Sequence, residues 1–459
     1  MRGETTPLTV DGIGALARGR GPRVVWVDEQ GPHSWAAFGA RVEQIAGDCT
    51  TAGVRPGEVV LIPAESRLDT LAWGFGAAAA GAVVAPLGMD RQGEAEGWGS
   101  RFKISWRVRH DELVRDVRGA DSSRAQRILA ELRSRGHPGL ILSTGGTTGA
   151  PKLVLHDLAV LLSFVPVRDG RMWRTLPLMR FDHIGGLDMA WRALAGGQTL
   201  VKPPESLSPE SVALSIEANR VEVLPATPSF LNLLLLSGAH RNHDLGSLRI
   251  VPYGAEPMPE GLLERLRAAL PRATFVQRFG TSETGTLPLV PGGAGLKLQS
   301  GSLGYGWKVV GGELWVLSPS LALGYLSDEP GAFDDSGWFR TGDIAEQLPD
   351  GSIRVLGRRT DLINVGGEKV IPSEVEGWLL SHPLVADCRV RPEASAVLGQ
   401  VVAAEIVWLG PEDDPVLVKR RIHEFATTRM ARHKLPVVVR LVDGIGATRN
   451  LKKARFAPV

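Results

Sequence analysis

The chain has 459 residues, of which 43% are apolar and 22% charged, and these proportions are typical of globular proteins rather than disordered ones. Its 52 Lys and Arg residues nearly balance its 50 Asp and Glu residues, so the net charge of +2 does not favour nucleic acid or an anionic membrane as a partner. The two cysteines, Cys49 and Cys388, lie far apart, which argues against a disulfide framework and a zinc cluster. We therefore expect a cytoplasmic globular protein that binds neither nucleic acid nor a membrane.

An uncharged stretch at residues 70–89 is long enough to raise the question of a membrane span. Gly74, Gly76, Gly81 and Pro86 interrupt it, and Gly81 separates an Ala-rich half from a Val-rich half. We therefore expect a buried helix followed by a turn and a strand at these residues.

Short β-branched runs alternate with amphipathic stretches over the first 250 residues. The segment 35–53, for example, has apolar residues at helical spacing and ends at Gly53. This alternation predicts parallel sheets that are covered by helices. The runs expected to form strands lie at 24–27, 59–62, 83–87, 140–143, 222–225 and 248–253.

From about Gly311 the pattern changes to short strands joined by turns, which predicts a β-rich segment with hairpins. Residues 416–435 have the periodicity of a helix, and the charged segment GRRTD at 357–361 separates two apolar strands. We therefore predict an α/β fold with two domains. A large N-terminal domain (1–357) would combine helix-covered sheets with a distorted β-barrel segment, and a small mobile α+β lid domain (358–459) would follow.

The most informative motif is LILSTGGTTGAPK at residues 140–152. A strand-like run ends there in consecutive Ser, Thr and Gly residues, whose backbone N–H groups and hydroxyls can surround a phosphate. Lys152 adds a positive charge to this loop. The loop is not a Walker A motif, because Pro151 precedes the lysine and no Gly-Lys-Ser/Thr sequence closes it.

This loop resembles the Ser/Thr/Gly-rich loop of the adenylate-forming superfamily, which contains acyl- and aryl-CoA ligases, adenylation domains of peptide synthetases and luciferases. Further segments resemble the other motifs of that superfamily in the same order and span nearly the whole chain. They are FGTSETG at 279–285, GELWVLSPSLALGYL at 312–326, WFRTGD at 338–343, GRRTDLINVGGEKVIPSEVE at 357–376 and NLKKAR at 450–455.

The resemblance implies a reaction in two steps, with ATP and Mg²⁺ as cofactors. A carboxylate attacks the α-phosphate of ATP to give an acyl adenylate and pyrophosphate, and a thiol, here expected to be that of CoA, then displaces AMP. Glycine amides, hydroxyls, Mg²⁺ and a lysine suit this chemistry, because phosphoryl transfer depends on positioning and on neutralising phosphate charge. The acid is expected to be aromatic or of medium size.

The resemblance also implies roles for individual residues in binding the nucleotide. Lys452, Glu283 and Thr148 are the expected catalytic residues, and Glu283 is the expected ligand of Mg²⁺. Asp343 would accept hydrogen bonds from the ribose, the role preferred here to that of an Asp that caps the backbone of its turn. The remaining residues expected at the nucleotide are Ser143, Thr144, Gly145, Gly146, Thr147 and Lys152 at the phosphates, Phe279, Gly254, Ala255 and Glu256 at the base, and Gly280, Thr281, Ser282 and Arg358.

The sequence departs from the superfamily's pattern at three places, one of which is the short region between Met89 and Gly136. Thr360, followed by Asp361, stands at the hinge where Asp or Lys is usual, which can alter the balance between two domain orientations. Leu451 replaces the usual glycine before the final lysine. We assign that lysine to Lys452 rather than Lys453, because Lys452 keeps the three-residue spacing to an arginine.

The segment LPLMRFDHIGGLDMA at 176–190 resembles the part of CoA ligases that lines the acid pocket. It implies that His183 gates this pocket, with Thr227 and Gly254 nearby. Asp182 is either a solvated turn residue or a contact for an amine or hydroxyl of the substrate. The paired glycines Gly366 and Gly367, with Lys369, resemble CoA-using members, since their backbone would let a pantetheine arm pass closely.

Three alternatives remain open from the sequence. The enzyme could load a carrier protein instead of CoA. It could activate a non-carboxylate acid, such as nitrite, for transfer to an aryl amine in a biosynthetic pathway. It could also be a non-catalytic relative that binds adenine nucleotide, for which the altered hinge and Leu451 are the only supporting features.

Overall fold

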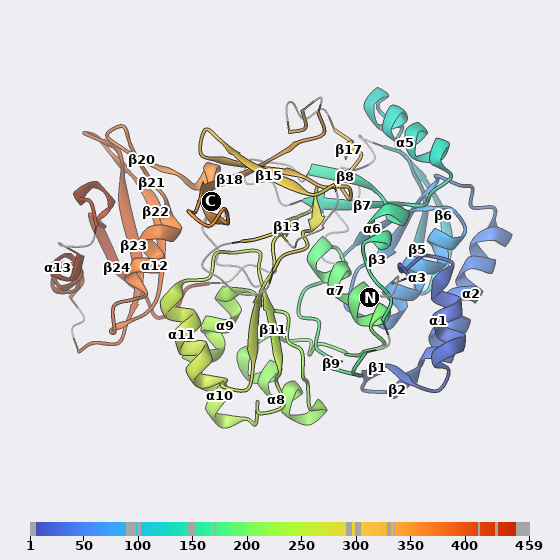
Figure 1. Ribbon diagram of the computed structural model, residues 1–459, viewed down its shortest axis with the longest axis horizontal. Helices are drawn as coiled ribbons and strands as arrows, with labels where there is room; N and C mark the ends of the chain where they lie inside the picture. Colours follow the sequence, from blue (N-terminus) through green and yellow to red (C-terminus); the bar gives the residue numbers. More distant parts are fainter. Residues whose placement is uncertain are drawn as a thin grey trace.

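The computed structural model has an α/β architecture built from several sheets (Figure 1). In Figure 1 the largest sheet and its helices lie on the right, and the residues from about 363 onward form a unit on the left. The residues that the structure describes are 6–88, 98, 102–144, 152–168, 170–290, 296–298, 304–327, 332–334, 336–411, 414–426 and 430–446.

The largest sheet has seven strands in the order β17-β8-β7-β4-β3-β5-β6. Its central strands pair in parallel, as the alternation of runs and helices predicts, whereas β6, β8 and β17 pair antiparallel with their neighbours. The strands are β3 (Val59–Pro63), β4 (Val83–Leu87), β5 (Ile104–Arg109), β6 (Glu112–Arg118), β7 (Gly139–Thr144), β8 (Lys152–Asp157) and β17 (Gly324–Tyr325).

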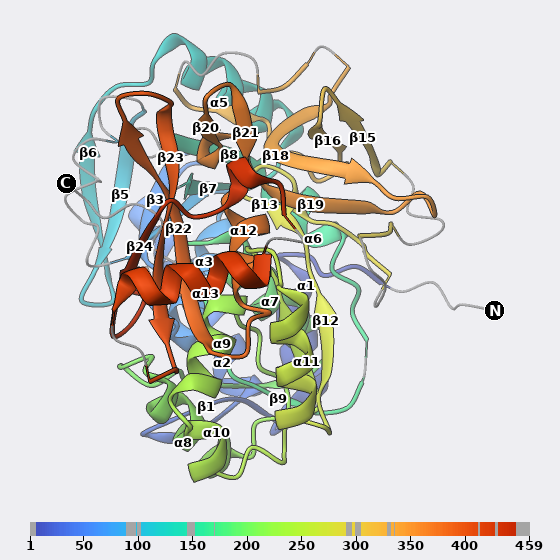
Figure 2. The same ribbon diagram turned by 90° about the vertical axis from the view of Figure 1, so that its left-hand side faces the viewer.

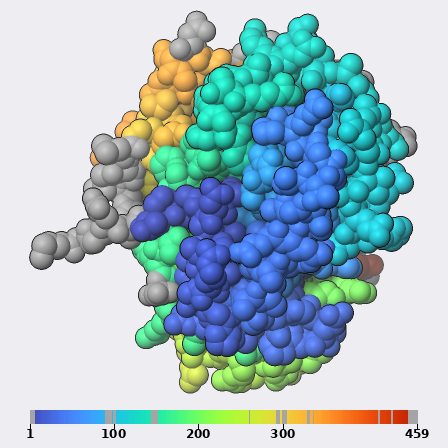
Figure 3. Space-filling model, turned by 90° about the vertical axis from the view of Figure 1, so that its right-hand side faces the viewer, coloured from blue at the N-terminus to red at the C-terminus, as the bar shows by residue number. Residues whose placement is uncertain are grey.

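Helices cover both faces of this sheet, because alternate strand residues point to opposite sides. In β3, Val60 and Ile62 belong to the core on one face, while Val59 and Leu61 belong to the core on the other. Figure 3 shows α1 and α2 in blue beside the cyan surface of β5, β6 and α5. The helices are α1 (Gly12–Arg20), α2 (Trp35–Ala52), α3 (Leu68–Ala79) and α7 (Ile184–Ala195) on the first face, and α5 (Ser123–Arg135) on the second.

The uncharged stretch at 70–89 belongs to this buried core. It forms most of α3 and all of β4, and Gly81 makes the turn between them in a left-handed conformation. Every residue of β4 is buried. Among the helices that the structure describes, none is long and apolar enough to cross a membrane.

A second sheet lies beside the first and carries the segments that enclose one side of the site. Four strands have the order β2-β1-β10-β9, and bridges at Val223 connect them to the parallel pair β11–β12. The expected strand at 222–225 is therefore reduced to isolated bridges, because Pro225 has no N–H to donate. The elements are β1 (Val24–Asp28), β2 (Gly31–Ser34), β9 (Arg174–Thr175), β10 (Thr199–Val201), β11 (Ile250–Tyr253), β12 (Thr274–Gln277), α6 (Leu158–Ser163), α8 (Pro209–Asn219), α9 (Pro228–Leu236), α10 (Ala239–Asn242) and α11 (Glu260–Ala269).

The β-rich segment after Gly280 forms antiparallel hairpins, as expected. Its main sheet has the order β15-β16-β18-β19 and a small core of its own. The expected distorted barrel is an open four-stranded sheet in the described residues, because β15 and β19 lie at opposite ends of this order. The strands are β13 (Gly280–Thr281), β14 (Gly285–Thr286), β15 (Gly306–Val310), β16 (Glu313–Leu317), β18 (Phe339–Gln347) and β19 (Ile353–Arg358).

The C-terminal unit has a five-stranded sheet, in the order β21-β20-β23-β22 with β24 beside β23, and its core takes residues from 363 to 441 alone. In Figure 2, α13 lies across this sheet on the side facing the viewer. The domain boundary at 357 stays a prediction, and it falls within β19. The elements are η2 (Arg359–Asp361), β20 (Ile363–Val365), β21 (Glu368–Val370), α12 (Pro372–Leu379), β22 (Val385–Ser395), β23 (Gly399–Trp408), α13 (Pro415–Ala426), η3 (Arg432–Lys434) and β24 (Val438–Leu441).

The expected helix at 416–435 is wrong in its extent. Helix α13 is described as far as Ala426, whereas Ala431 has an extended backbone and residues 432–434 form a separate 3₁₀ turn, so one continuous helix does not reach residue 435. Pro436 follows shortly after, and a proline disfavours helical conformation in the residue before it.

Candidate functional site

The strands on either side of the Ser/Thr/Gly-rich loop are well placed to hold a phosphate-binding segment. β7 and β8 pair antiparallel, so that Ser143 faces Leu153 and Thr144 faces Lys152 across the ladder. Ser143 is buried. Gly145, Gly146, Thr147 and Thr148 lie outside the described residues, so their expected contacts with phosphates stay predictions.

Lys152 and Glu283 both contact the side chain of Tyr325. The Lys152 ammonium lies 5.5 Å from the centre of the Tyr325 ring. The Tyr325 hydroxyl donates a 2.6 Å hydrogen bond to Oε1 of Glu283, whose carboxylate is buried. Sequence reasoning missed Tyr325, although it lies within the matched segment 312–326. The structure therefore brings the expected phosphate-binding lysine and the expected metal ligand to one place.

The turn between β13 and β14 carries Ser282 and Glu283, and internal hydrogen bonds hold its shape. Thr281 N–H donates to Oγ1 of Thr284 at 3.0 Å, and Thr284 N–H donates back to Oγ1 of Thr281 at 3.2 Å. The hydroxyls of Ser318 and Ser320 each donate to the Thr284 carbonyl at 3.0 Å. Thr284, which sequence reasoning did not single out, thus positions the two expected site residues beside it.

His156 of β8 forms a hydrogen bond with the same turn. Its Nε2 lies 2.5 Å from the carbonyl oxygen of Ser282, and the side chain is completely buried. Burial lowers the pKa of His156, so the neutral imidazole donates its Nε2–H to this carbonyl. β8 therefore supplies both Lys152 at the loop and the support for Ser282.

Asp343 and Arg358 are brought together as neighbours across β18 and β19. Arg358 Nε lies 3.0 Å from Oδ1 of Asp343, and its Nη1 donates to the Thr341 carbonyl at 2.6 Å. The Asp343 carboxylate is buried, and its own N–H donates to Oγ1 of Thr341. An ionised carboxylate held in one orientation is suited to accept hydrogen bonds from a diol.

The expected base-lining segment 254–256 has an unusual backbone. Ala255 has φ +68°, a left-handed conformation that is rare for a residue with a Cβ. A Cβ at Gly254 would lie 2.6 Å from the Arg278 carbonyl oxygen, so this position requires glycine. Gly254 therefore packs directly against the residue that precedes Phe279, and the half-buried Phe279 ring contacts the small core of the β15–β19 sheet.

Glu256 and Thr227 take part in holding the start of α9. The Glu256 carboxylate accepts from the N–H of Ser229 at 3.2 Å and from its hydroxyl at 2.6 Å. Thr227 is the N-cap residue, and its Oγ1 accepts from the Phe230 N–H at 3.2 Å. Both side chains thus have structural contacts, and their expected roles at the base and the acid stay predictions.

Asp182 is buried, so the interpretation of it as a solvated turn residue is wrong. Its carboxylate lies 3.5 Å from Nη2 of Arg180 and 3.4 Å from Nε2 of His183. These two side chains offset the free-energy cost of burying the carboxylate. His183 is the N-cap residue of α7. Gly186 follows in the first turn, where a Cβ would lie 2.1 Å from the Arg180 carbonyl oxygen.

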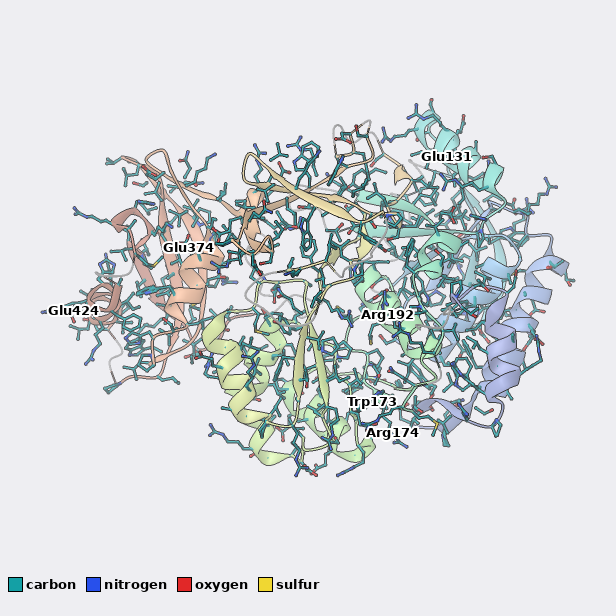
Figure 4. All side chains as sticks on the ribbon, viewed as in Figure 1. Glu131, Trp173, Arg174, Arg192, Glu374 and Glu424 are labelled. Atoms are coloured by element: carbon teal, nitrogen blue, oxygen red, sulfur yellow. The ribbon has the colours of Figure 1, made fainter. Side chains whose placement is uncertain are left out.

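Further charged residues on and beside α7 were not singled out from the sequence. Arg192 Nε donates to Oδ2 of Asp188 at 2.8 Å along the helix, and Figure 4 labels Arg192 on α7. Arg278 follows β12, and its backbone N–H donates to the Tyr253 carbonyl at 2.7 Å. Two features of the sequence could have identified these residues. Asp188 and Arg192 have the i, i+4 spacing of an ion pair on a helix, and Arg278 directly precedes Phe279.

The expected thiol-binding glycines form the tight turn of the β20–β21 hairpin. Gly366 and Gly367 have φ values of +58° and +98°, and the Gly366 N–H donates to the Leu398 carbonyl at 3.0 Å. Lys369 is exposed on β21, opposite Asn364. The backbone of this turn is thus free of Cβ atoms where a narrow chain could pass.

The expected hinge is the short 3₁₀ turn η2. Thr360 Oγ1 donates to Oδ1 of the buried Asp361 at 3.2 Å, so Asp361 has a local partner. Arg359 and Arg340 each place a nitrogen 3.0 Å from Oε2 of Glu313, which ties the hinge to the β15–β19 sheet. Lys452 and Leu451 lie outside the described residues.

Two family models match the chain, one in the N-terminal part and one in the C-terminal unit. Residues 103–326 match the family model described as "AMP-binding enzyme", and residues 374–452 match "AMP-binding enzyme C-terminal domain". The chain is 32% identical over 337 residues to the 2-succinylbenzoate–CoA ligase of Bacillus licheniformis, covering 69% of this chain and 68% of that protein. It is 29% identical over 347 residues to the indoleacetate–CoA ligase of Aromatoleum aromaticum, covering 68% and 64%.

The fold is similar to that of solved enzymes. The structure of the anthranilate CoA ligase AuaEII in complex with anthranoyl-AMP superposes with a TM-score of 0.79. The superposition covers 98% of this chain and 96% of that one at 19% sequence identity. This likeness confirms the predicted α/β architecture with a large N-terminal and a small C-terminal part.

Proposed function

Because this chain belongs to the adenylate-forming superfamily of AMP-binding enzymes, we propose that it uses ATP to activate a carboxylic acid as an acyl adenylate and transfers the acyl group to the thiol of CoA. The observation that carries the proposal is the contact of Tyr325 with both Lys152 and Glu283 beside the end of β7. This contact gathers a cation and a buried carboxylate where the Ser/Thr/Gly-rich loop begins.

In the first step the described residues orient the nucleotide. Lys152 would balance charge on the β- and γ-phosphates, and the loop at 145–148, which lies outside the described residues, is expected to add backbone amides and hydroxyls. Ser282, held by its rigid turn, would lie at the α-phosphate. Asp343 would bind the ribose hydroxyls, with Arg358 fixing its carboxylate at 3.0 Å. Such preorganised polar groups stabilise developing charge without reorganising during the reaction.

The donor set fits Mg²⁺ bound mostly through the nucleotide. In the parts of the chain that the structure describes, no group of three or more His, Cys, Asp and Glu side chains could hold a metal ion. Nucleotide-bound Mg²⁺ usually takes one or two carboxylates and completes its shell with phosphate oxygens and water. The single buried carboxylate of Glu283, fixed by Tyr325, fits that need. When bound, the ion would neutralise phosphate charge during transfer.

Lys452 would complete the adenylation site from the C-terminal unit. A lysine that bridges the attacking carboxylate and the α-phosphate must leave before a thiol can reach the adenylate, so the two steps require two placements of that unit. Gly366, Gly367 and Lys369 would then meet the thiol arm in the second placement.

The relatives support an aromatic acid as the substrate. The two curated relatives are named for 2-succinylbenzoate and indoleacetate, and the solved ligase is named for anthranilate, so all three names carry an aromatic ring. His183 at the start of α7, Gly254 and Thr227 are the residues that we place around this ring. Because a hydrophobic pocket discriminates by only about 1–3 kcal/mol per methylene, related aromatic acids should also react.

The test is a measurement of AMP formation with aromatic, fatty and amino acids, each with and without CoA. We expect an aromatic acid to support AMP formation and CoA to convert the adenylate to a thioester detectable by mass spectrometry. If AMP forms but CoA gives no thioester, the acceptor is a carrier protein or another nucleophile. If no acid supports AMP formation or pyrophosphate exchange, the proposed activity is wrong.

A further inference from the structure

A cavity of about 230 Å³ lies beside the C-terminal end of α7. Its charged lining residues are three arginines, and in the parts of the chain that the structure describes no acidic side chain borders it. Figure 4 labels two of the lining residues, Arg192 on α7 and Trp173 below it. The polar and aromatic side chains at the cavity are those of Arg168, Arg171, Trp173, Arg192 and Gln198. A cavity with this lining is suited to an anionic ligand.

The segment that carries Arg168, Arg171 and Trp173 is fixed at two points. The Arg168 N–H donates to the Ala195 carbonyl at 3.2 Å, and the Trp173 carbonyl accepts from the Thr199 N–H at 2.9 Å. The Arg171 guanidinium lies 5.4 Å from the centre of the Trp173 ring, which restricts its position. These contacts hold one wall of the cavity in place before a ligand binds, and this lowers the entropy cost of binding.

Two other side chains at the cavity offer hydrogen-bond donors rather than acceptors. Gln198 Oε1 accepts from the Thr175 hydroxyl at 2.7 Å, so the amide NH₂ is the part of this side chain that remains for a ligand. Arg192 uses its Nε to bind Oδ2 of Asp188 at 2.8 Å, and among the described residues no other acceptor binds this guanidinium. Its two terminal nitrogens therefore keep their donors.

The charge at the cavity stays positive after the ion pair on α7 is counted. Asp188 balances Arg192, which leaves the exposed guanidinium groups of Arg168 and Arg171. Within the described ranges of the chain, neither of these two groups forms an ion pair or donates a hydrogen bond. Asp169, between them in the sequence, lies outside those ranges. Arginines gathered without a carboxylate for each of them are typical of phosphate recognition, because a guanidinium binds phosphate through paired N–H groups.

The end of α7 is also prepared for an anion. The last carbonyl groups of a helix normally disfavour a negative charge. Here the buried Arg20 already binds two of them, with Nη1 donating to the Leu194 carbonyl at 2.5 Å and Nη2 to the Ala195 carbonyl at 2.8 Å. A Cβ at Gly197 would lie 3.3 Å from the Arg20 Cζ, so this cation lies next to the turn that leads to Gln198. Arg20 therefore offsets the unfavourable end of the helix dipole.

The cavity is separate from the site proposed for adenylation. Of the residues that we assign to the nucleotide, the acid and the thiol, none that the structure describes borders it. His183 directly precedes α7, whereas Arg192 lies in its last turn, and a helix of 12 residues is about 18 Å long. A ligand in this cavity would therefore leave the sites for acid and ATP unoccupied.

We propose that this cavity binds the phosphate group of a small molecule, with the three arginines and the Gln198 amide as its donors. The inference goes beyond the proposed function, because it concerns a ligand other than the reacting acid, ATP or CoA. Inorganic phosphate and a small phosphate ester share the chemistry that these donors recognise, and the experiment distinguishes between them.

The test is isothermal titration of the full chain, first saturated with ATP in the absence of any acid, with inorganic phosphate or with glycerol 3-phosphate at constant ionic strength. We expect one bound molecule per chain. Binding of both probes shows that the phosphate group suffices, and binding of glycerol 3-phosphate alone identifies an ester as the ligand. Arg168→Gln and Arg171→Gln should each weaken binding at least about tenfold, through loss of a charged donor.

Arg241→Gln is the matched control, because Arg241 is an exposed arginine of α10 that does not line the cavity. It should leave the Kd unchanged. Arg168 and Arg171 are exposed, so both variants should fold, and if one does not, the other decides.

Three results would overturn the inference. In the first, neither probe binds to the ATP-saturated protein, or the Kd is equal in the Arg168, Arg171 and Arg241 variants. In the second, phosphate binds only without ATP, which places it in the nucleotide site. In the third, phosphate binds only to an Asp169→Asn variant, which shows that the chain's own carboxylate fills the cavity. A failure of ATP itself to bind would contradict the proposed function instead, and the probes would then be compared without ATP.

Discussion

Two turns, one in each part of the molecule, carry the residues proposed for the two half-reactions, and they are built differently. The β13–β14 turn around Ser282 is held by the reciprocal Thr281–Thr284 bonds, by His156 and by serine hydroxyls. The β20–β21 turn rests on two left-handed glycines and a backbone bond to Leu398. The β13–β14 turn is preorganised for adenylate formation. The β20–β21 turn keeps the backbone freedom of glycine, which suits a contact proposed for the thiol-transfer step only.

An ion pair connects the hinge to the β15–β19 sheet. Arg359, with most of its side chain exposed, pairs with the buried carboxylate of Glu313. On the other side, the Asn232 amide donates to the Ala386 carbonyl at 3.5 Å. A single long hydrogen bond of this kind is compatible with the two placements that we propose for the C-terminal unit.

The largest effect should follow from removing the lysine that the C-terminal unit is proposed to supply. Lys452→Ala should lower the rate of adenylation by about 10²–10³, or about 3–4 kcal/mol, because its contact is realised in the transition state. The second step should survive, since this lysine is then displaced from the site. The measurement compares ATP-driven turnover with thioester formation from a pre-made acyl adenylate and CoA. Lys453→Ala is the control, and a selective loss there would move the assignment by one residue.

A smaller effect is expected from the fixed part of the site. Asp343→Ala should weaken ATP binding about ten- to a hundredfold, or about 1.5–3 kcal/mol, through loss of a charged acceptor for the ribose. The affinity can be measured by isothermal titration of ATP. Asp350→Ala removes an exposed carboxylate from the β18–β19 turn and should leave ATP affinity unchanged. Equal affinities in the Asp343 variant and the native protein would show that Asp343 only shapes its turn.

Tyr325→Phe isolates a single hydrogen bond in the rigid part. It removes the 2.6 Å bond to Glu283 but keeps the ring beneath Lys152. We expect kcat for adenylation to fall about fivefold to tenfold, or about 1–1.5 kcal/mol. Tyr325→Leu, which also removes the ring, should cost more. If Phe and Leu reduce kcat equally, the contact with Lys152 contributes nothing and the hydroxyl carries the whole effect.

The smallest expected effect is a change in the thermal stability of the protein, caused by a histidine that lies outside both turns. The His243 imidazole lies between Glu217, at 2.9 Å from Nδ1, and Glu210, at 2.8 Å from Nε2, and its bond to Glu217 is the main cause of its raised pKa. A pKa raised by folding stabilises the protein below the unfolded value, about 6.5, and this contribution is lost as the pH rises through the folded pKa. His243→Gln should therefore lower Tm more at pH 6 than at pH 8.5. A Tm difference that is the same at both pH values would contradict this.

Much of the fold could be predicted from local sequence. Runs such as 83–87 and 140–143 form central strands that pair in parallel, because their apolar residues are buried on both faces of the sheet. Gly81 marks its turn correctly. The run at 222–225 failed because Pro225 removes a donor that a strand needs, and the helix at 416–435 failed because periodicity alone does not locate a helix end.

Site residues could be predicted from the sequence where they lie within one continuous motif. Contacts between segments that are distant in sequence could not be predicted. The motifs named Glu283, Asp343 and Arg358, and the structure brings the last two together across neighbouring strands. The buried state of Asp182 could not be inferred, because it depends on how Arg180 and His183 fold around it. Gly254 packs against the backbone of Arg278, and this contact between two separate segments becomes visible only in three dimensions.

The pairing of β17 with β8 has a consequence for biosynthesis. Gly324 and Tyr325 pair with Leu155 and Val154, so an edge strand of the largest sheet comes from a segment made some 170 residues after its partner. A nascent chain that stops before this segment exposes the backbone of β8, and such an edge invites pairing with other chains. Because Tyr325 also holds Glu283, folding of that edge and assembly of the site are completed by the same two residues. Ribosomal release of the segment around 325 should therefore complete this edge, and nucleotide binding should follow once Asp343 and Arg358 have also emerged and paired.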